Sequence, residues 1–190
     1  MSSLQSLRAI IVLVSIATAL SASSVAASYE VANDGGSAAN STADSAPRYL
    51  MGAAGSDYHT ALLNAVNTER AARGLSKLCR SSKLQSAAQT HSNDMAKRNY
   101  LGHTGSDGST VESRIDDAGY HWIDVAENVA AGQASVQSVM SSWMSSSHHR
   151  ANILSRKYKM FGCGYAYRSS SKYDHYWTQD FASGSGEVCS

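Results

Sequence analysis

Two aromatic stretches near the C-terminus constrain the fold of this chain more than any other feature. KMFGCGYAYR (159–168) and HYWTQDFA (175–182) are rich in strand-forming residues and flank SSSKYD, a segment of good turn residues. They predict a β-hairpin. Because successive residues of a strand point to opposite faces, one face of the first strand carries Phe161, Cys163, Tyr165 and Tyr167.

Helical patterns dominate the chain before this hairpin. Ser56 is positioned to cap a first helix over 57–73, and Gly74 to end it. Apolar residues recur at three- and four-residue steps over 82–99, which predicts a second helix. A short third helix ends at Gly119. The inward stripe predicted for the first helix consists of Leu62, Ala65, Val66 and Glu69.

A fourth helix is predicted from Ser135 to about Ser146, with Trp143 on its apolar stripe. The segment 121–130 is a weaker strand-like stretch, and the glycine-flanked segment 101–110 is a loop. Helices on a small antiparallel sheet predict an α+β domain built in layers.

The first 27 residues have the layout of a secretory signal peptide. Arg8 precedes an apolar run from Ala9 to Leu20, and small residues follow up to Ala27. The run is shorter than the roughly 20 residues that a membrane-spanning helix needs. We therefore expect cleavage after Ala27 and an exported, extracellular, soluble chain with no membrane span. The alternative is an uncleaved anchor.

Residues 28–56 are rich in Ser, Ala, Gly and Asn and poor in large apolar residues, so they predict a flexible linker before a domain over 57–190. The linker holds the glycosylation sequon at Asn40. The whole chain has 16 Lys and Arg against 15 Asp and Glu, a formal net charge of +1. Such a balance argues against a nucleic-acid-binding protein, which usually shows a basic patch or stripe.

Three cysteines leave one unpaired if a disulfide forms after export. Cys163 lies inside a predicted strand, where a cysteine is often a small buried hydrophobe. Cys189 lies in a terminal tail that needs an attachment to stay ordered. We predict the pair Cys79–Cys189, which closes a long loop worth about 4 kcal/mol in the chain-entropy model. The competing pair is Cys163–Cys189.

Several ionisable residues stand beside turns or element ends and are candidates for chemistry. They are His91, His103, Glu127 and the neighbours His148 and His149. In an extended segment only one of the two neighbours faces inward. Two imidazoles and a carboxylate can hold Zn²⁺ with an open water position, although no local metal-ligand spacing occurs. His91 lies on the apolar stripe of the second helix, where a histidine is more often a core residue.

Other catalytic arrangements receive less support from the sequence. No Gly-x-Ser-x-Gly motif occurs, which disfavours a serine hydrolase. Cys163, flanked by glycines, is a conceivable nucleophile, but a buried structural thiol is the commoner case.

Six segments in register resemble the CAP superfamily of cysteine-rich secretory, antigen 5 and pathogenesis-related 1 proteins, in its short bacterial or microbial form. The segments are LLNAVNTERAARG, LQSAAQTHSNDMA, GHTGSDGST, AENVAAG, SSWMSSSHHRANIL and HYWTQDFA. The resemblance implies an SCP-like domain folded as a three-layer α-β-α sandwich. It also implies a central cleft with two histidines and two acidic residues.

Carried over by motif, the cleft residues implied here are His103, Glu127 and His149, with His149 rather than His148 facing the cleft. The second acid of many members corresponds to Ser146, so the acid is missing. A hydroxyl in place of a carboxylate weakens the attraction for a cation. The resemblance therefore implies no required cofactor, and at most a weak site for Zn²⁺ or another divalent cation at His103 and His149.

The resemblance favours a secreted, non-catalytic binding module for a small apolar ligand of the sterol or fatty acid type, in host–microbe interaction. Aromatic residues such as Trp122, Trp143, Tyr165 and Trp177 would either line the cleft or pack the core. One alternative is a metal-assisted secreted protease or other hydrolase, in which a chelator would stop cleavage. Another is a surface-associated structural protein without a functional cleft.

Overall fold

A computed structural model describes residues 57–190 of the chain. The predicted signal peptide, the linker and the sequon at Asn40 lie outside the described residues. No helix within 57–190 is both long enough and apolar enough to cross a membrane.

Helices and strands alternate irregularly along the described chain. The helices are α1 (Tyr58–Ala71), α2 (Ser82–Arg98), α3 (Val111–Asp117), α4 (Val136–Ser145) and α5 (Ser147–Ile153). The strands are β1 (Cys79–Arg80), β2 (Trp122–Ala131), β3 (Met160–Arg168) and β4 (Asp174–Gly184).

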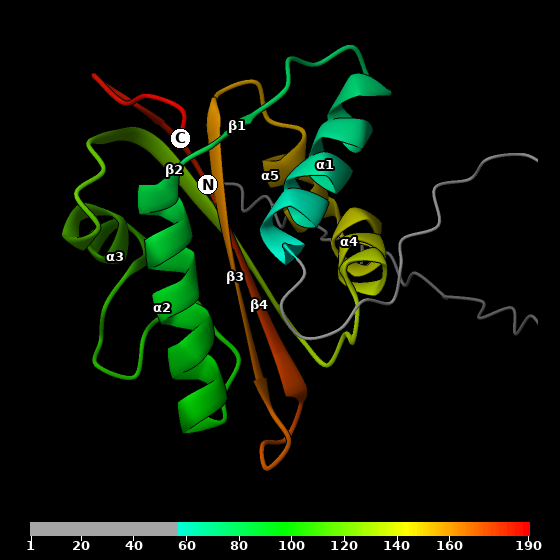
Figure 1. The fold of residues 1–190 in the computed structure, drawn as a ribbon, viewed down its shortest axis with the longest axis vertical. Coiled ribbons are helices and arrows are strands. Elements are labelled where there is room, and N and C mark those ends of the chain that lie inside the picture. Colours follow the sequence, from blue (N-terminus) through cyan, green and yellow to red (C-terminus); the bar gives the residue numbers. More distant parts are fainter. Residues whose placement is uncertain (1–56) are drawn as a thin grey trace, which may run out of the picture. The chain divides into compact units, whose positions relative to one another are not determined.

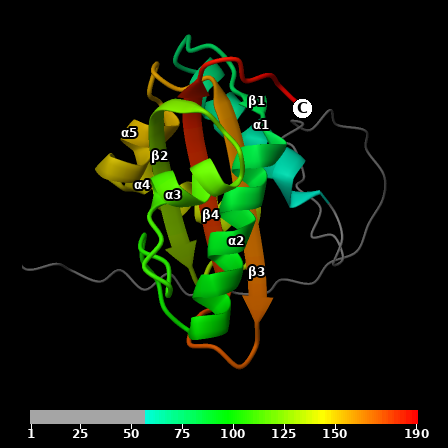
Figure 2. The same cartoon turned by 90° about the vertical axis from the view of Figure 1, so that its left-hand side faces the viewer.

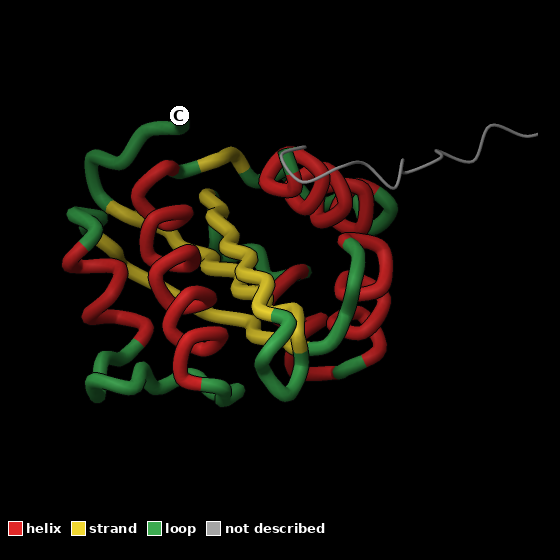
Figure 3. Tube along the Cα trace, turned by 60° about the horizontal axis from the view of Figure 1, so that its bottom comes forward, coloured by secondary structure: helices red, strands yellow, loops and turns green. Residues whose placement is uncertain are grey.

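The strands form one sheet in the order β1-β3-β4-β2, in which β1 runs parallel to β3 and the other pairs are antiparallel. Helices α2 and α3 cover one face of the sheet, and α1, α4 and α5 cover the other (Figures 1 and 3). The α+β class and its layered sandwich are thus confirmed, as is the hairpin formed by β3 and β4.

The two faces of the sheet bury different side chains because the strands alternate. On the α1, α4 and α5 side, the core includes Leu62, Val66, Trp143, Ile153, Phe161, Cys163, Trp177 and Phe181. On the α2 and α3 side, smaller groups such as Leu84, Ile115, Tyr120 and Ala182 pack together. Trp143 and Trp177 therefore belong to the core, whereas Trp122 is 37 % exposed.

Two glycines of β3 let α2 lie directly on the sheet, and Figure 2 shows α2 in front of the face of the sheet. A Cβ atom added at Gly162 would come within 2.2 Å of the backbone nitrogen of Gln85, and one at Gly164 within 2.3 Å of the carbonyl oxygen of Ala88. Close helix–strand contact thus explains the glycines on either side of Cys163.

The start and the buried face of α1 differ from the sequence prediction. Asp57, not Ser56, caps the helix, because its carboxylate accepts from the backbone N–H of Thr60 at 3.1 Å. Arg70, not Glu69, is the charged residue on the buried face. The aliphatic part of an arginine can be buried while its guanidinium binds carbonyl groups, which the simple apolar pattern does not anticipate.

Two short elements were not predicted. The pair His148 and His149, which we treated as part of an extended segment, lies in the helix α5 (Ser147–Ile153), and Ser146 separates this helix from α4 with an extended backbone (φ −88°, ψ 127°). Strand β1 has two residues and exists through its pairing with β3. Elements this short contain too few residues to show a helical or strand periodicity in the sequence.

The predicted disulfide Cys79–Cys189 is confirmed, and it joins two residues with a sequence separation of 110. It fixes the C-terminal tail to β1. Cys163 is free and buried. Burial raises the pKa of its thiol, so the thiolate needed for a nucleophile is suppressed.

Candidate functional site

The site begins with two adjacent residues of β2 that point to opposite faces of the sheet. The carboxylate of Glu127 lies on the α2 and α3 side, where it pairs with Arg114. The amide of Asn128 lies on the other side, where its Nδ2 donates to the carbonyl of His149 at 3.1 Å. The dipeptide thus contacts both helical layers from one strand at the margin of the sheet.

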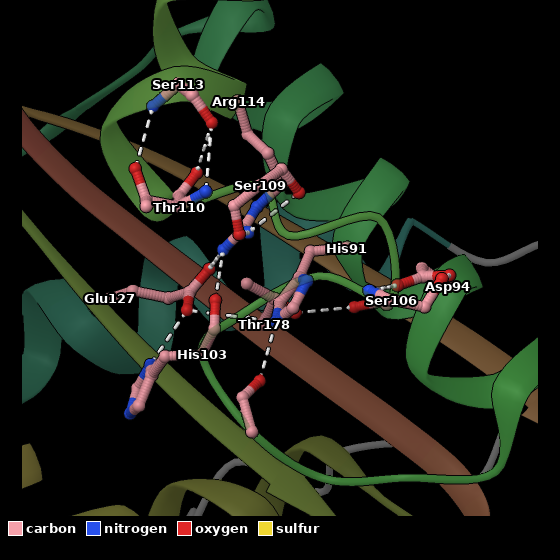
Figure 4. A network of polar contacts seen from close by, with 12 residues as sticks. His91, Asp94, His103, Ser106, Ser109, Thr110, Ser113, Arg114, Glu127 and Thr178 are labelled. Carbon is pink, nitrogen blue, oxygen red and sulfur yellow. Dashed lines mark hydrogen bonds and ion pairs between the residues drawn. The ribbon is translucent and has the colours of Figure 1, made fainter.

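Glu127 is buried and holds two cationic partners (Figure 4). Its Oε2 accepts from Nη2 of Arg114 at 2.7 Å, and its Oε1 accepts from Nδ1 of His103 at 2.8 Å. The same Nη2 donates to the carbonyl of His103 at 3.0 Å. Arg114 therefore fixes both the carboxylate and the backbone of the histidine that the carboxylate binds.

The loop 101–110 that carries His103 is attached to α2 by Asp94 (Figure 4). Asp94 accepts from the backbone N–H and the hydroxyl of Ser106, both at 2.7 Å, and from the hydroxyl of Tyr100 at 2.6 Å. Burial opposes ionisation of Asp94, but these hydrogen bonds outweigh it and lower its pKa. The loop is thus held at both ends of the segment that contains His103.

His149 reaches the site from α5. Its side chain is half-buried, whereas that of His148 is exposed. Its carbonyl is bound by Asn128, and the Oδ1 of Asn128 in turn accepts from Asn152 at 2.9 Å. Of the two adjacent histidines, His149 is thus the more buried one, and its backbone is bonded to the strand that carries Glu127.

The two imidazoles differ in protonation. A hydrogen bond to Glu127 raises the pKa of His103, although burial works against it. Burial lowers the pKa of His149, and the nearby positive charges of His103 and His148 lower it further. Near neutral pH the site therefore combines an imidazole that gains a proton easily with a second one that stays neutral.

Asp180 is a second carboxyl beside Glu127, and the sequence analysis missed it. The two residues are directly opposite each other on β2 and β4. Asp180 is 1 % exposed, and neither of its oxygens has a hydrogen-bond partner. Burial and the charge of Glu127 raise its pKa well above the ordinary value. An unpaired buried carboxylate is costly, so burial favours the protonated form of Asp180, whereas Glu127 is paired with Arg114.

His91 is fully buried beneath the site. Its Nε2 donates to the carbonyl of Gly102 at 2.7 Å and lies 3.9 Å from Oε1 of Glu127. Its Nδ1 is buried without a partner. Burial lowers its pKa, which keeps the ring neutral. His91 thus acts as a core histidine that supports the loop.

Ser146 and the metal prediction fit the structure less well. Ser146 occupies the cap position of α5 but makes no capping hydrogen bond through its side chain. Within residues 57–190, no group of three or more His, Cys, Asp or Glu side chains is arranged to hold a metal ion. Both oxygens of Glu127 are already bonded, so His103 and His149 alone remain as the predicted divalent site.

Of the four residues that the sequence analysis named for the cleft, the structure places His103 in direct contact with Glu127, and the backbone of His149 in contact with Asn128, the next residue of β2. Sequence reasoning missed Arg114 and Asp180. A signal for Asp180 was present, since a lone acid between strongly strand-forming residues is unusual in a buried strand. Arg114 offered none, because its partner is set by the packing of α3 on β2.

A model of the cysteine-rich secretory protein family, CAP, matches residues 63–181. The chain belongs to the CAP family. The matched region includes every element that contributes to the site, from α1 to the middle of β4.

The relatives of this chain include longer proteins. YkwD of Bacillus subtilis, whose function is uncharacterised, is 31 % identical over 126 residues, which are 66 % of this chain and 47 % of YkwD. An extracellular SCP-domain protein of Bacillus anthracis is 25 % identical with a TM-score of 0.59, over 65 % of this chain and 39 % of that one. The chain thus spans less than half the length of these two relatives.

The fold is also shared with an outer surface protein of Borrelia burgdorferi. The TM-score is 0.61 at 17 % identity, over 66 % of this chain and 92 % of that one. At this identity the likeness concerns the fold. The solved neighbours are thus described as extracellular or outer-surface proteins.

Proposed function

We propose that this chain is an exported binding module, and that His103 and His149 together bind the carboxylate head of a fatty-acid-type ligand without transforming it. One observation carries the proposal. The side chain of His103 is 55 % exposed, yet its Nδ1 is held by a carboxylate that is 1 % exposed. The imidazole of His103 is thus held by a buried carboxylate on one edge, and its other edge is open to solvent, where it can contact a ligand.

The protonation states of the two imidazoles favour a ligand whose head group is a carboxylate. Nδ1 of His103 is committed to Glu127, whereas its Nε2 has no hydrogen-bond partner among residues 57–190. When His103 is protonated, Nε2–H is a charged donor, which binds a carboxylate more strongly than a hydroxyl. Of the two apolar ligand classes, a fatty acid offers a carboxylate and a sterol only a hydroxyl. Leu101 is 45 % exposed two residues away and offers apolar surface for the chain.

The bonding of Glu127 favours binding over hydrolysis. A general base must lie within hydrogen-bond reach of the attacking water. The side chain of Glu127 is 1 % exposed, and its two oxygens face Arg114 and His103. This geometry therefore gives no separate support to the alternative function, a metal-assisted hydrolase.

Three observations support export. The N-terminal segment has the pattern of a cleaved signal peptide. The structural neighbours are an extracellular protein and an outer surface protein. A disulfide between Cys79 and Cys189 suits an oxidising compartment.

The test is calorimetric titration of the purified chain with decanoate, with variants His103→Gln and His149→Gln, and with His148→Gln as a matched control. We expect saturable binding that weakens at least tenfold in the first two variants and stays unchanged in the control. Equal binding by all four proteins, or no binding by the wild type, would refute the proposal. Turnover of a peptide library that a chelator abolishes would instead establish the hydrolase.

A further inference from the structure

A second feature of the molecule lies away from the histidines, between the end of α1 and the segment before β3. A pocket of about 230 Å³ opens there. It shares no lining residue with the His103 site. Its lining residues are Arg70, Gly74, Leu75, Ser76, Arg156, Tyr158 and Lys159. Three of them are cationic, and none is acidic.

Arg70 carries a buried charge without a matching carboxylate. It is 2 % exposed, and its Nε and Nη1 donate to the carbonyls of Ser76, Ile153 and Ser155, each at 2.8 Å. Within the described chain it forms no ion pair, and its Nη2 makes no hydrogen bond. Arg114, which is similarly buried, is paired with Glu127. Burial lowers the pKa of Arg70, but a guanidinium stays protonated in proteins.

The other two cations of the pocket are also unpaired. Neither Arg156 nor Lys159 makes an ion pair or a side-chain hydrogen bond with any residue of 57–190, and both are exposed. Neighbouring cations differ in this respect, since Arg73 pairs with Glu69 and Lys157 approaches Asp124. An almost neutral chain thus concentrates uncompensated positive charge at one small concavity.

We propose that this pocket binds an oxyanion of the phosphate or sulfate class, free or as an ester. The planar fork of Arg156 has no partner within 57–190 and matches such tetrahedral oxyanions, while Arg70 and Lys159 add two further positive charges to balance a double negative charge. The pocket is smaller than the roughly 300–1,000 Å³ of sites for drug-sized ligands. It therefore suits a compact anionic group, and Tyr158 offers a wall for the organic part of an ester.

The test uses calorimetry of the full chain with inorganic phosphate, inorganic sulfate and glucose 6-phosphate, at constant ionic strength set with chloride. The pocket variant is Arg156→Gln/Lys159→Gln, which leaves the structural hydrogen bonds of Arg70 intact. The control is Lys97→Gln/Arg98→Gln, which removes the same charge from two exposed residues of α2. We expect saturable binding that weakens at least tenfold in the pocket variant and less than twofold in the control.

A further arm separates the sources of the anion. Vesicles of phosphatidylcholine with and without phosphatidate are sedimented with each protein. Pocket-dependent binding to phosphatidate assigns the oxyanion to a lipid headgroup, and binding of the soluble anions alone assigns it to a soluble ester or ion. Equal losses in pocket variant and control, or no saturable binding of any probe, would overturn the proposal. His103→Gln retains phosphate binding if the two sites are independent.

Discussion

Replacing Arg114 by methionine tests the electrostatic foundation of the site. The guanidinium is 5 % exposed at its side chain and bonds to Glu127 at 2.7 Å, to the carbonyl of His103 at 3.0 Å and to that of Ser109 at 3.1 Å. Methionine keeps a similar length without the charge or the donors. Glu127 would then lose its buried ion-pair partner while it stays beside Asp180.

The expected cost follows from that unpaired charge. Removing one partner of a buried ion pair costs about 3–5 kcal/mol. Domains of this size have total stabilities of about 5–15 kcal/mol, so this is a large fraction. Each kcal/mol lowers the melting temperature by about 2–8 °C, depending on domain size, so we expect a decrease of at least about 6 °C. Arg98→Met, at an exposed position of α2, is expected to change stability by less than about 0.5 kcal/mol.

The assay is urea unfolding followed by the fluorescence of the buried residues Trp143 and Trp177. A double variant, Arg114→Met/Glu127→Gln, separates the charge from the lost hydrogen bonds. If the unpaired carboxylate causes the loss, the double variant is more stable than Arg114→Met. A loss below about 1 kcal/mol in the single variant, or no recovery in the double one, would refute the reasoning.

Three further predictions concern the packing and the titration of the site. Gly164→Ala destabilises the domain by about 1–3 kcal/mol, because the added Cβ would overlap the backbone of Ala88. Gly102→Ala is the control and leaves stability unchanged, because its added Cβ meets no atom closer than 3.9 Å. The measurement is the urea midpoint of each variant, and equal midpoints would contradict the prediction. The stability of Asp180→Asn relative to the wild type increases as pH rises from about 4 to 7, because a buried acid with a raised pKa must take up a proton on folding. The measurement is the free energy of unfolding of both proteins over this pH range. A relative stability that falls as pH rises would contradict the prediction. The raised pKa of His103 contributes stability that is present below pH ~6.5 and is lost as pH rises through the folded-state pKa. The difference in free energy of unfolding between the wild type and His103→Gln should therefore decrease from pH 6 to 8. A difference that stays constant would show that the pKa of His103 is not shifted.

The hairpin and the long helix were within reach of the sequence because their patterns are local. Strands β3 and β4 are rich in aromatic residues and flank a turn, and α2 repeats its apolar residues over 17 positions. Each pattern is set by the geometry of its own element. The short elements β1 and α5 were missed because tertiary contacts determine them. Strand β1 forms by pairing with β3, and α5 is separated from α4 by the extended backbone of Ser146.

The site was predictable only in part. Local patterns identified His103, Glu127 and His149 as candidates, but only the family resemblance placed them together, because contacts between distant segments leave no period in the sequence. Arg114 and Asp180 depend on the same contacts. Their charges are intelligible only once α3 and β4 are packed around Glu127.

The most direct test of the central claim is an NMR titration of the histidine rings in the wild type and in Glu127→Gln. The account states that Glu127 holds His103 beside His149, so that the first pKa is raised and the second lowered from about 6.5. In the wild type, the His103 ring should titrate above that value and the His149 ring below it. In the variant, the His103 pKa should fall. A His103 ring that titrates identically in both proteins would contradict the account.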